Sequence, residues 1–405
     1  MTNIIMNKEK INLLISQIII AIIGLITGKI IAIYFTPSDF GEFNLQFALY
    51  TFFFTLLLNP FIQFVKTYTN TLLPKIGFNY FKILGISLAL LMYIIMFITI
   101  LIKYPTNYYL YIIIIIIIPV NCMFLLISDF FNIKNKLNEY SLINFVKAFV
   151  PLLLLGGMFL YNYKYTNGVQ YLWYFQIIGF SISSILFFTK YKFSFNNLYR
   201  ISFIKFLKKY FKYATPLIIL AFWGWINNYF DRFAIEYFMD VKSVGIYNAN
   251  FSVGSKFFLL LNPFFLTILT SKIYTNNSSR VKKEIIKTYC KYYLFISLPL
   301  LILIFLFNDY IGLILLSKTY ESGFYIIFWI SIGYFLMTFS YLIEVIFYAE
   351  GNTKIILISN IFSALANVLL NILLIPKYEL NGVLVATLIS QVIRLLLITL
   401  SFKKI

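Results

Sequence analysis

The residues best suited to chemistry are charged side chains inside long apolar segments. They are Lys29, Arg232, Lys256 and Arg394, with the carboxylates Asp231 and Glu344 in the same kind of segment. An ionisable group inside a bilayer costs roughly 2.5 to 3.5 kcal/mol on insertion scales, so chains that keep such groups usually use them. Arginine grips phosphate through two N–H groups and lysine acts as a point charge. The excess of cations therefore predicts a cavity for an anionic ligand, such as a phosphate or pyrophosphate.

Each of these residues also has a structural interpretation. Asp231 and Arg232 are adjacent and serve equally well as an ion pair that faces a neighbouring helix. Lys29 can extend outward to the headgroups, and Glu344 can reach them at the inner surface. Asp231 and Glu344 are thus interpreted as either coupling or structural carboxylates. Lys256 and Arg394 are too deep to reach either surface comfortably, which favours the cavity for these two residues.

The composition is that of an integral membrane protein. Of 405 residues, 61% are hydrophobic and only 12% are charged, which leaves too little polar surface to cover a soluble globule. The formal net charge is +19, but most basic residues flank apolar segments, where membrane orientation explains them, so we expect no nucleic-acid partner. With no histidine and two separated cysteines, the sequence predicts neither a metal site nor a cofactor. The first apolar stretch lacks a small-residue cleavage site and is expected to be a retained span.

Apolar runs long enough to cross a hydrocarbon core of about 30 Å recur along the whole chain. We predict an all-α protein with twelve transmembrane helices. They lie near residues 11–35, 43–65, 81–102, 108–127, 142–161, 170–189, 213–236, 245–270, 291–308, 324–348, 354–375 and 382–402.

The distribution of Lys and Arg supports this count. The terminal tails and the even-numbered loops hold 23 of the 33 basic residues, the odd-numbered loops hold five, and five lie within spans. Because cytoplasmic loops are enriched in Lys and Arg, both termini are expected to be cytoplasmic.

The two halves of the chain carry matching motifs. Phe40-Gly41-Glu-Phe-Asn44 matches Val244-Gly245-Ile-Tyr-Asn248, which follows 204 residues later, and each copy opens the second helix of its half. A second pair, Lys164–Val169 and Lys377–Val383, lies between the fifth and sixth helices of each half. Since each half has six spans, the copies share one orientation and predict a parallel pseudo-two-fold repeat along the membrane normal.

This repeat divides the chain into three parts. Residues 1–195 form an N-terminal six-helix lobe, residues 196–212 a basic cytoplasmic linker, and residues 213–405 a C-terminal six-helix lobe. Parallel repeats of this kind place the substrate path between the lobes near the midplane and favour alternating access by rocking.

Three motifs in the second half carry a family resemblance. They are Pro216 followed by Asp231-Arg232, the run Tyr348-Ala-Glu-Gly-Asn-Thr-Lys354, and the run from Asn367 to Thr387. Together they resemble the bacterial polysaccharide biosynthesis flippases of the multidrug/oligosaccharidyl-lipid/polysaccharide exporter superfamily. The family usually has glycine where this chain has Glu379 and Leu380.

The resemblance implies a function and a place in the cell. Such proteins carry polyprenyl-pyrophosphate-linked oligosaccharide repeat units across the bacterial inner membrane for O-antigen or capsule synthesis. The implied partners are this lipid-linked oligosaccharide, membrane lipids and the polysaccharide polymerase machinery. The protein is expected to be a transporter and not an enzyme.

Other classes fit less well. A glycan polymerase or glycosyltransferase would need a sizeable outer loop, and the outer loops here are short. Membrane O-acyltransferases share a catalytic histidine, and this chain has no histidine. A drug/cation antiporter of the same superfamily is the main alternative, although such proteins tend to place carboxylates in their lobes. A scaffold without transport activity would not need buried cations.

Overall fold

A computed structural model of the chain describes residues 8–68, 71–72, 79–160, 168–188, 202–276 and 278–404. The first half contains α1 (Lys8–Tyr34), α2 (Pro37–Phe53), the π-helical segment η1 (Phe54–Leu58), α3 (Asn59–Tyr68), α5 (Asn79–Lys103), α6 (Tyr109–Ile133), α7 (Leu137–Leu160) and α8 (Val169–Phe188). The second half contains α9 (Phe203–Phe238), α10 (Val241–Tyr274), α11 (Ser279–Leu306), α12 (Asn308–Leu315), the 3-10 segment η2 (Lys318–Gly323), α13 (Tyr325–Ala349) and α14 (Thr353–Lys404).

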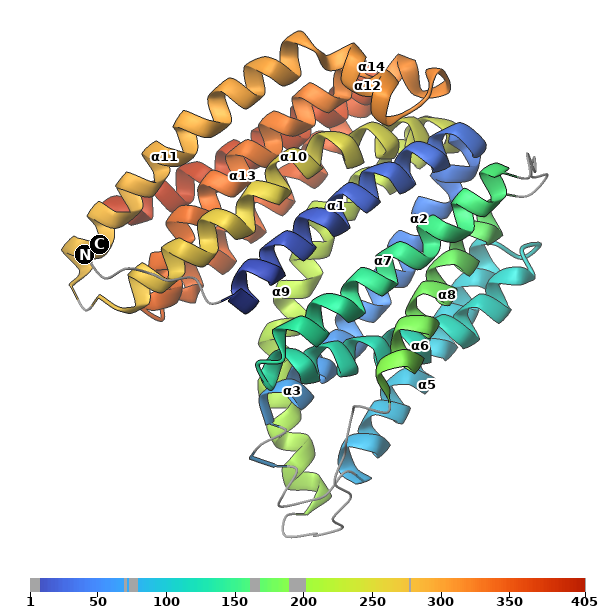
Figure 1. Cartoon of the computed structure of the whole chain (residues 1–405), viewed down its shortest axis with the longest axis horizontal. Coiled ribbons are helices and arrows are strands. Elements are labelled where there is room, and N and C mark those ends of the chain that lie inside the picture. The colour runs from blue at the N-terminus through green and yellow to red at the C-terminus, as the bar shows by residue number, and fades with distance from the viewer. Residues whose placement is uncertain are drawn as a thin grey trace. The chain divides into compact units, whose positions relative to one another are not determined.

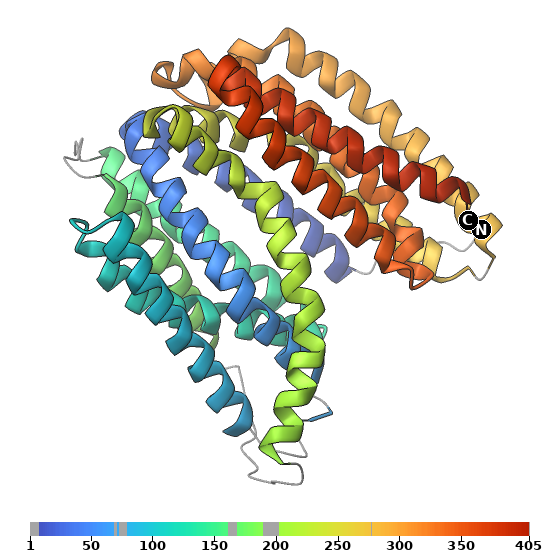
Figure 2. The same ribbon diagram turned by 180° about the vertical axis from the view of Figure 1, so that it is seen from behind.

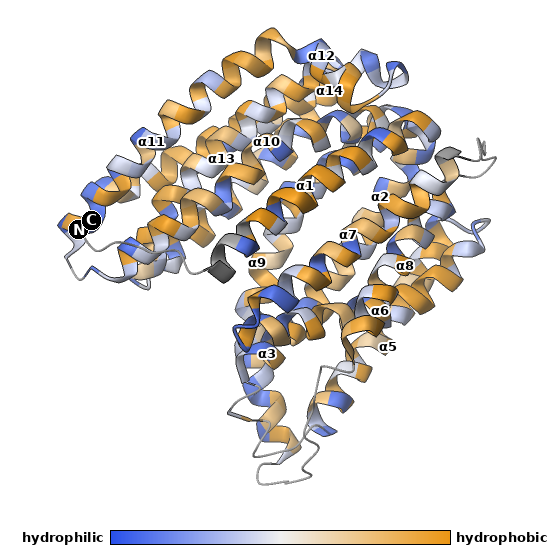
Figure 3. Ribbon diagram, viewed as in Figure 1, coloured by the Kyte–Doolittle hydropathy of each residue, from blue (hydrophilic) through white to orange (hydrophobic). Residues whose placement is uncertain are grey.

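These helices account for the predicted spans. Ten stretches in the described chain are long and apolar enough to cross a membrane, with Pro37–Tyr68 counted as one. Helix α9 adds the seventh predicted span behind a basic first section, and α14 carries both the eleventh and the twelfth. Figure 3 shows the matching pattern, with apolar helix bodies and hydrophilic residues gathered towards many of the helix ends.

Helix α14 is two antiparallel helices joined by a tight turn, as Figure 2 shows. The backbone at Glu379 has φ 51° and ψ −132°, a conformation that glycine adopts readily and other residues do not. A β-carbon at Gly382 would lie 2.6 Å from the backbone of Leu374, so this glycine lets the two halves pack closely beyond the turn. Glu379, one of the two positions at which the resembled family usually has glycine, therefore lies in a strained turn.

The chain forms two compact units. One comprises residues 1–27 and 46–222, and the other comprises residues 28–45 and 223–405. In the first, α6 packs against α5, α7 and α8; in the second, α13 packs against α10, α11 and α14, as the neighbouring ribbons in Figure 1 show. Residues 196–201 of the predicted linker 196–212, and most of the motif Lys164–Val169, lie outside the described residues. The predicted lobe boundaries stay a prediction.

Acidic residues at two helix starts act as caps. Asp39 accepts a hydrogen bond from the Thr36 hydroxyl at 2.7 Å, and its own N–H donates back to that hydroxyl at the start of α2. Asp240 accepts from the N–H of Ser243 at the start of α10. These carboxylates satisfy backbone donors that a helix start leaves open, so helix capping explains their presence.

Candidate functional site

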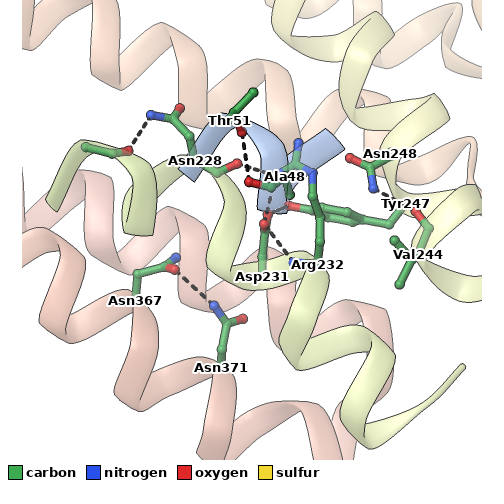
Figure 4. Close-up of polar contacts among 11 residues, drawn as sticks. Ala48, Thr51, Asn228, Asp231, Arg232, Val244, Tyr247, Asn248, Asn367 and Asn371 are labelled. Atoms are coloured by element: carbon green, nitrogen blue, oxygen red, sulfur yellow. Dashed lines mark hydrogen bonds and ion pairs between the residues drawn. The ribbon is translucent and has the colours of Figure 1, made fainter. Parts of the chain in front are cut away.

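Asp231 and Arg232 form a buried ion pair on α9, with each residue 6% exposed. The Arg232 guanidinium donates to Asp231 Oδ1 at 2.9 Å, and the Tyr247 hydroxyl of α10 donates to Oδ2 at 2.5 Å (Figure 4). The guanidinium also lies 4.8 Å from the ring centre of Tyr229. Both carboxylate oxygens of Asp231 are therefore already hydrogen-bonded, and its charge is balanced by its neighbour.

Glu344 and Arg394 form a second buried pair, between α13 and the second half of α14. Arg394 Nε and Nη2 donate to the same oxygen, Glu344 Oε1, at 3.2 and 2.8 Å. The residues are 1% and 6% exposed. One interpretation of the sequence let Glu344 extend to the headgroups. The buried pair shows that it does not. The Tyr341 ring, whose centre is 4.7 Å from the guanidinium carbon, covers the charge further through a cation–π contact.

One cavity of about 100 Å³ within the second unit touches both pairs. Asp231 lines it from α9 and Arg394 from α14. The remaining polar lining residues are Asn227 and Asn228 of α9, Tyr334 and Tyr341 of α13, and Asn360, Thr387 and Gln391 of α14. A space of this size lined by amides and hydroxyls holds a few water molecules or one small polar group.

Sequence reasoning missed most of these polar residues, although a signal for them exists. Thr387, Gln391 and Arg394 lie four and three residues apart, which places them on one face of a helix. Asn367 and Asn371 repeat the pattern on the first half of α14, where they are 4% and 0% exposed. The Asn371 amide donates to Asn367 Oδ1 at 3.0 Å, as Figure 4 shows.

The two lysines do not line this cavity. The Lys256 ammonium of α10 lies 3.9 Å from the position that a β-carbon would occupy at Gly28 of α1. Lys256 is half-buried, so it presents its charge close to the backbone of α1. Among the predicted site residues, Asp231 and Arg394 thus line one cavity, and their partners Arg232 and Glu344 lie beside them. Lys29 and Lys256 lie elsewhere in the same unit.

Lys29 caps a helix end. Its ammonium donates to the carbonyl oxygens of Leu313, at 2.7 Å, and of Leu316, which end α12. The Tyr320 hydroxyl of η2 donates to the Phe35 carbonyl at 3.1 Å, so the segment after α12 is anchored to the end of α1. Burial raises the pKa of the Tyr320 phenol, which keeps this donor protonated. These contacts favour a structural role for Lys29, because a cation at a helix C-terminus satisfies open carbonyls and the helix dipole.

The two copies of the repeat motif touch each other. A β-carbon at Gly41 would lie 2.0 Å from the Val241 carbonyl oxygen, and a β-carbon at Gly245 would lie 1.7 Å from the Pro37 carbonyl oxygen. Val241 precedes Gly245 by four residues, as Pro37 precedes Gly41, so the contact is reciprocal. Only glycine fits at either position, and the backbones of α2 and α10 meet without side chains between them.

Comparison with known proteins shows the fold. No family model and no curated protein sequence matches the chain. Among solved structures, the lipid II flippase MurJ in an inward closed conformation has a TM-score of 0.73 at 20% identity, covering 97% of this chain and 87% of that one. An inward-facing multidrug resistance MATE family transporter of the MOP superfamily has a TM-score of 0.67 at 12% identity, covering 96% and 98%.

A MATE protein in its straight conformation gives a TM-score of 0.58 at 12% identity. All three comparisons cover at least 96% of this chain. The chain is therefore a multi-pass membrane protein with the all-helical fold that these structures share, twelve helices in two lobes.

Proposed function

We propose that the protein is a flippase that moves polyprenyl-pyrophosphate-linked oligosaccharide repeat units across the bacterial inner membrane by alternating access, for O-antigen or capsule synthesis. Both termini face the cytoplasm in this proposal. The fold supports transport, since the similar solved structures are a lipid II flippase and multidrug transporters. The chemistry of the buried charges supports the first of these substrate classes.

The state of the buried carboxylates carries the proposal. A transporter of cationic drugs needs a carboxylate whose charge is available to the drug. Here Asp231 is bonded through both oxygens, and Glu344 accepts two N–H groups from Arg394. Each acid is thus paired with an arginine, and Lys256 is a further basic residue in the same unit. An anionic head group, which must find compensating charge when it leaves water, fits this balance better than a cation does.

The drug/cation antiporter remains the second candidate, because the MATE-type structures share the fold. It would require Asp231 or Glu344 to leave its arginine during transport. Breaking a buried pair in this way costs about 3 to 5 kcal/mol, since an uncompensated charge is left behind. This cost is an argument for the anionic substrate.

A genetic experiment tests the proposed function. A strain without the gene should lose a surface glycan, and expression of the wild-type chain should restore it. Lys256→Ala should fail to restore it at normal protein levels, whereas Lys354→Ala, which removes an exposed cation at the start of α14, should restore it. An unchanged surface glycan in the deletion strain, combined with increased sensitivity to cationic drugs, would favour the antiporter instead.

A further inference from the structure

The first unit contains an apolar groove that the transport mechanism above does not use. It is a cavity of about 210 Å³ bounded by the end of η1, α3, α5 and α6. Phe61 and Val65 line it from α3, Gly85 and Ala89 from α5, and Pro119 and Cys122 from α6. Among the described residues, Lys82 is the one charged side chain in its lining, so the groove combines an apolar wall with a cation.

The order of residues on α5 explains why a groove forms there. Lys82, Gly85 and Ala89 follow one another at helical spacing and share one face of α5. Gly85 has no side chain, and the Phe61 ring lies within 2.9 Å of the place a β-carbon would take. The Phe61 ring thus packs directly on α5 at Gly85, and the α5 residues that line the groove extend about 10 Å along the helix from Lys82 to Ala89 at 1.5 Å per residue.

The facing walls depart from regular α-helix. Residues Phe54–Leu58 adopt a π-helical turn directly before α3, and Pro119 interrupts the hydrogen bonding inside α6. Pro60 lacks the N–H that would bond the preceding turn, which accounts for the wider π turn. Single π turns inside helices occur frequently at functional sites.

Charge identifies the head group that suits this groove. Lys66, which is close by on α3, is neutralised by Asp129 at 2.8 Å. Lys82 is exposed and makes no ion pair within the described residues. Its loop is one of those expected to face the cytoplasm, so its ammonium lies at the level of the inner head groups. A lysine in this position attracts a phosphate as a point charge.

We infer that this groove binds the polyprenyl chain of a phosphate-linked lipid, with the first phosphate at Lys82 and the hydrocarbon along Gly85, Ala89 and Cys122. This inference rests on the proposed function, whose substrate has a single chain, and one chain suits a single groove along one helix. A bilayer phospholipid has two chains, and the second would have to lie outside. The groove holds the lipid at the inner leaflet while its head group enters the transport path.

Cys122 offers a direct test, because the chain has only two cysteines and Cys290 lies in the other unit. In a Cys290→Ser background, the alkylation rate of Cys122 by N-ethylmaleimide is measured by mass spectrometry in nanodiscs. Undecaprenyl phosphate at ten times its dissociation constant should slow the reaction about tenfold. Undecaprenol, which lacks the phosphate, and phosphatidylglycerol at the same concentration should protect much less.

Matched variants sharpen the test. Lys82→Glu should remove the protection by undecaprenyl phosphate, and Lys354→Glu, the same charge change at an exposed site on α14, should not. Ala89→Trp should fill the groove and slow alkylation without added lipid, whereas Ile94→Trp, at a 59% exposed position on the same helix, should not. Equal protection by phosphatidylglycerol, or protection that survives Lys82→Glu, would overturn the inference.

The binding assay is independent of transport. Protection of Cys122 without any flipping of a lipid-linked oligosaccharide would leave the groove in place and reject the proposed function. Flipping that persists undiminished in Lys82→Glu and Ala89→Trp would reject the groove and leave the function.

Discussion

Removing the guanidinium of Arg394 should destabilise the protein through the partner it leaves behind. In Arg394→Ala, the Glu344 carboxylate stays 1% exposed and loses both N–H donors. Breaking a buried ion pair by removing one partner costs about 3 to 5 kcal/mol. Arg394→Lys keeps the charge but not both N–H contacts to Glu344 Oε1, so its cost should be smaller than that of Arg394→Ala.

The double variant Glu344→Met/Arg394→Met separates stability from function. Replacing both partners by apolar residues of similar volume is often neutral or stabilising. Unfolding free energies in mixed micelles should therefore show a large loss for Arg394→Ala and little loss for the double variant. If Arg394 contacts the substrate, the double variant should fold normally and still fail to restore the surface glycan.

Two results would refute this reasoning. A cost below about 1 kcal/mol for Arg394→Ala would place it in the range of exposed pairs and show that the charges are not buried together. Full restoration of the glycan by the double variant would show that Arg394 has only a structural role.

Three further predictions follow from particular contacts. Gly245→Ala should destabilise the protein and impair export, because its β-carbon would lie 1.7 Å from the Pro37 carbonyl oxygen. Gly156→Ala is the control, since nothing lies within 4 Å of its β-carbon position. Equal behaviour of the two variants would contradict the close contact. Glu379→Gly should raise the unfolding free energy by about 1 kcal/mol by relieving the strained turn, whereas Leu380→Gly should not, as thermal melts would show. Single cysteines at Ser202 and Thr319, both exposed, should be labelled from the cytoplasmic and the outer side respectively; labelling from the same side would contradict the twelve-helix topology.

The helices and the turns could be predicted because their signals are local. Hydropathy marks each span, and Pro376 with Asn381-Gly382 predicts the break that the structure places at Glu379. The motif at Glu350-Gly351-Asn352 also marks a helix end: Gly351 has φ 72°, and the Asn352 N–H bonds the Phe347 carbonyl at 2.8 Å. Capping and turn chemistry depend on neighbours in sequence, so they can be recognised without a structure.

The partners of the buried charges could not be predicted in the same way. Glu344 and Arg394 are 50 residues apart, and Lys29 and Leu313 are 284 apart. Their meeting depends on how α13 packs against α14 and how α12 ends, which helical periodicity does not encode. The sequence left Lys29 open between a cavity cation and a side chain that extends to the headgroups, and its contacts at the end of α12 could not be foreseen from its depth.

The most direct test of an anionic lipid-linked substrate is flipping by the purified protein in proteoliposomes. A fluorescent polyprenyl-pyrophosphate-linked oligosaccharide is placed in one leaflet, and its appearance in the other is measured beside the uptake of ethidium, a cationic dye. We expect flipping of the lipid without accumulation of ethidium, and a loss of about tenfold or more in Lys256→Ala, which corresponds to about 1.4 kcal/mol of barrier. Accumulation of ethidium without flipping of the lipid would contradict the proposed substrate.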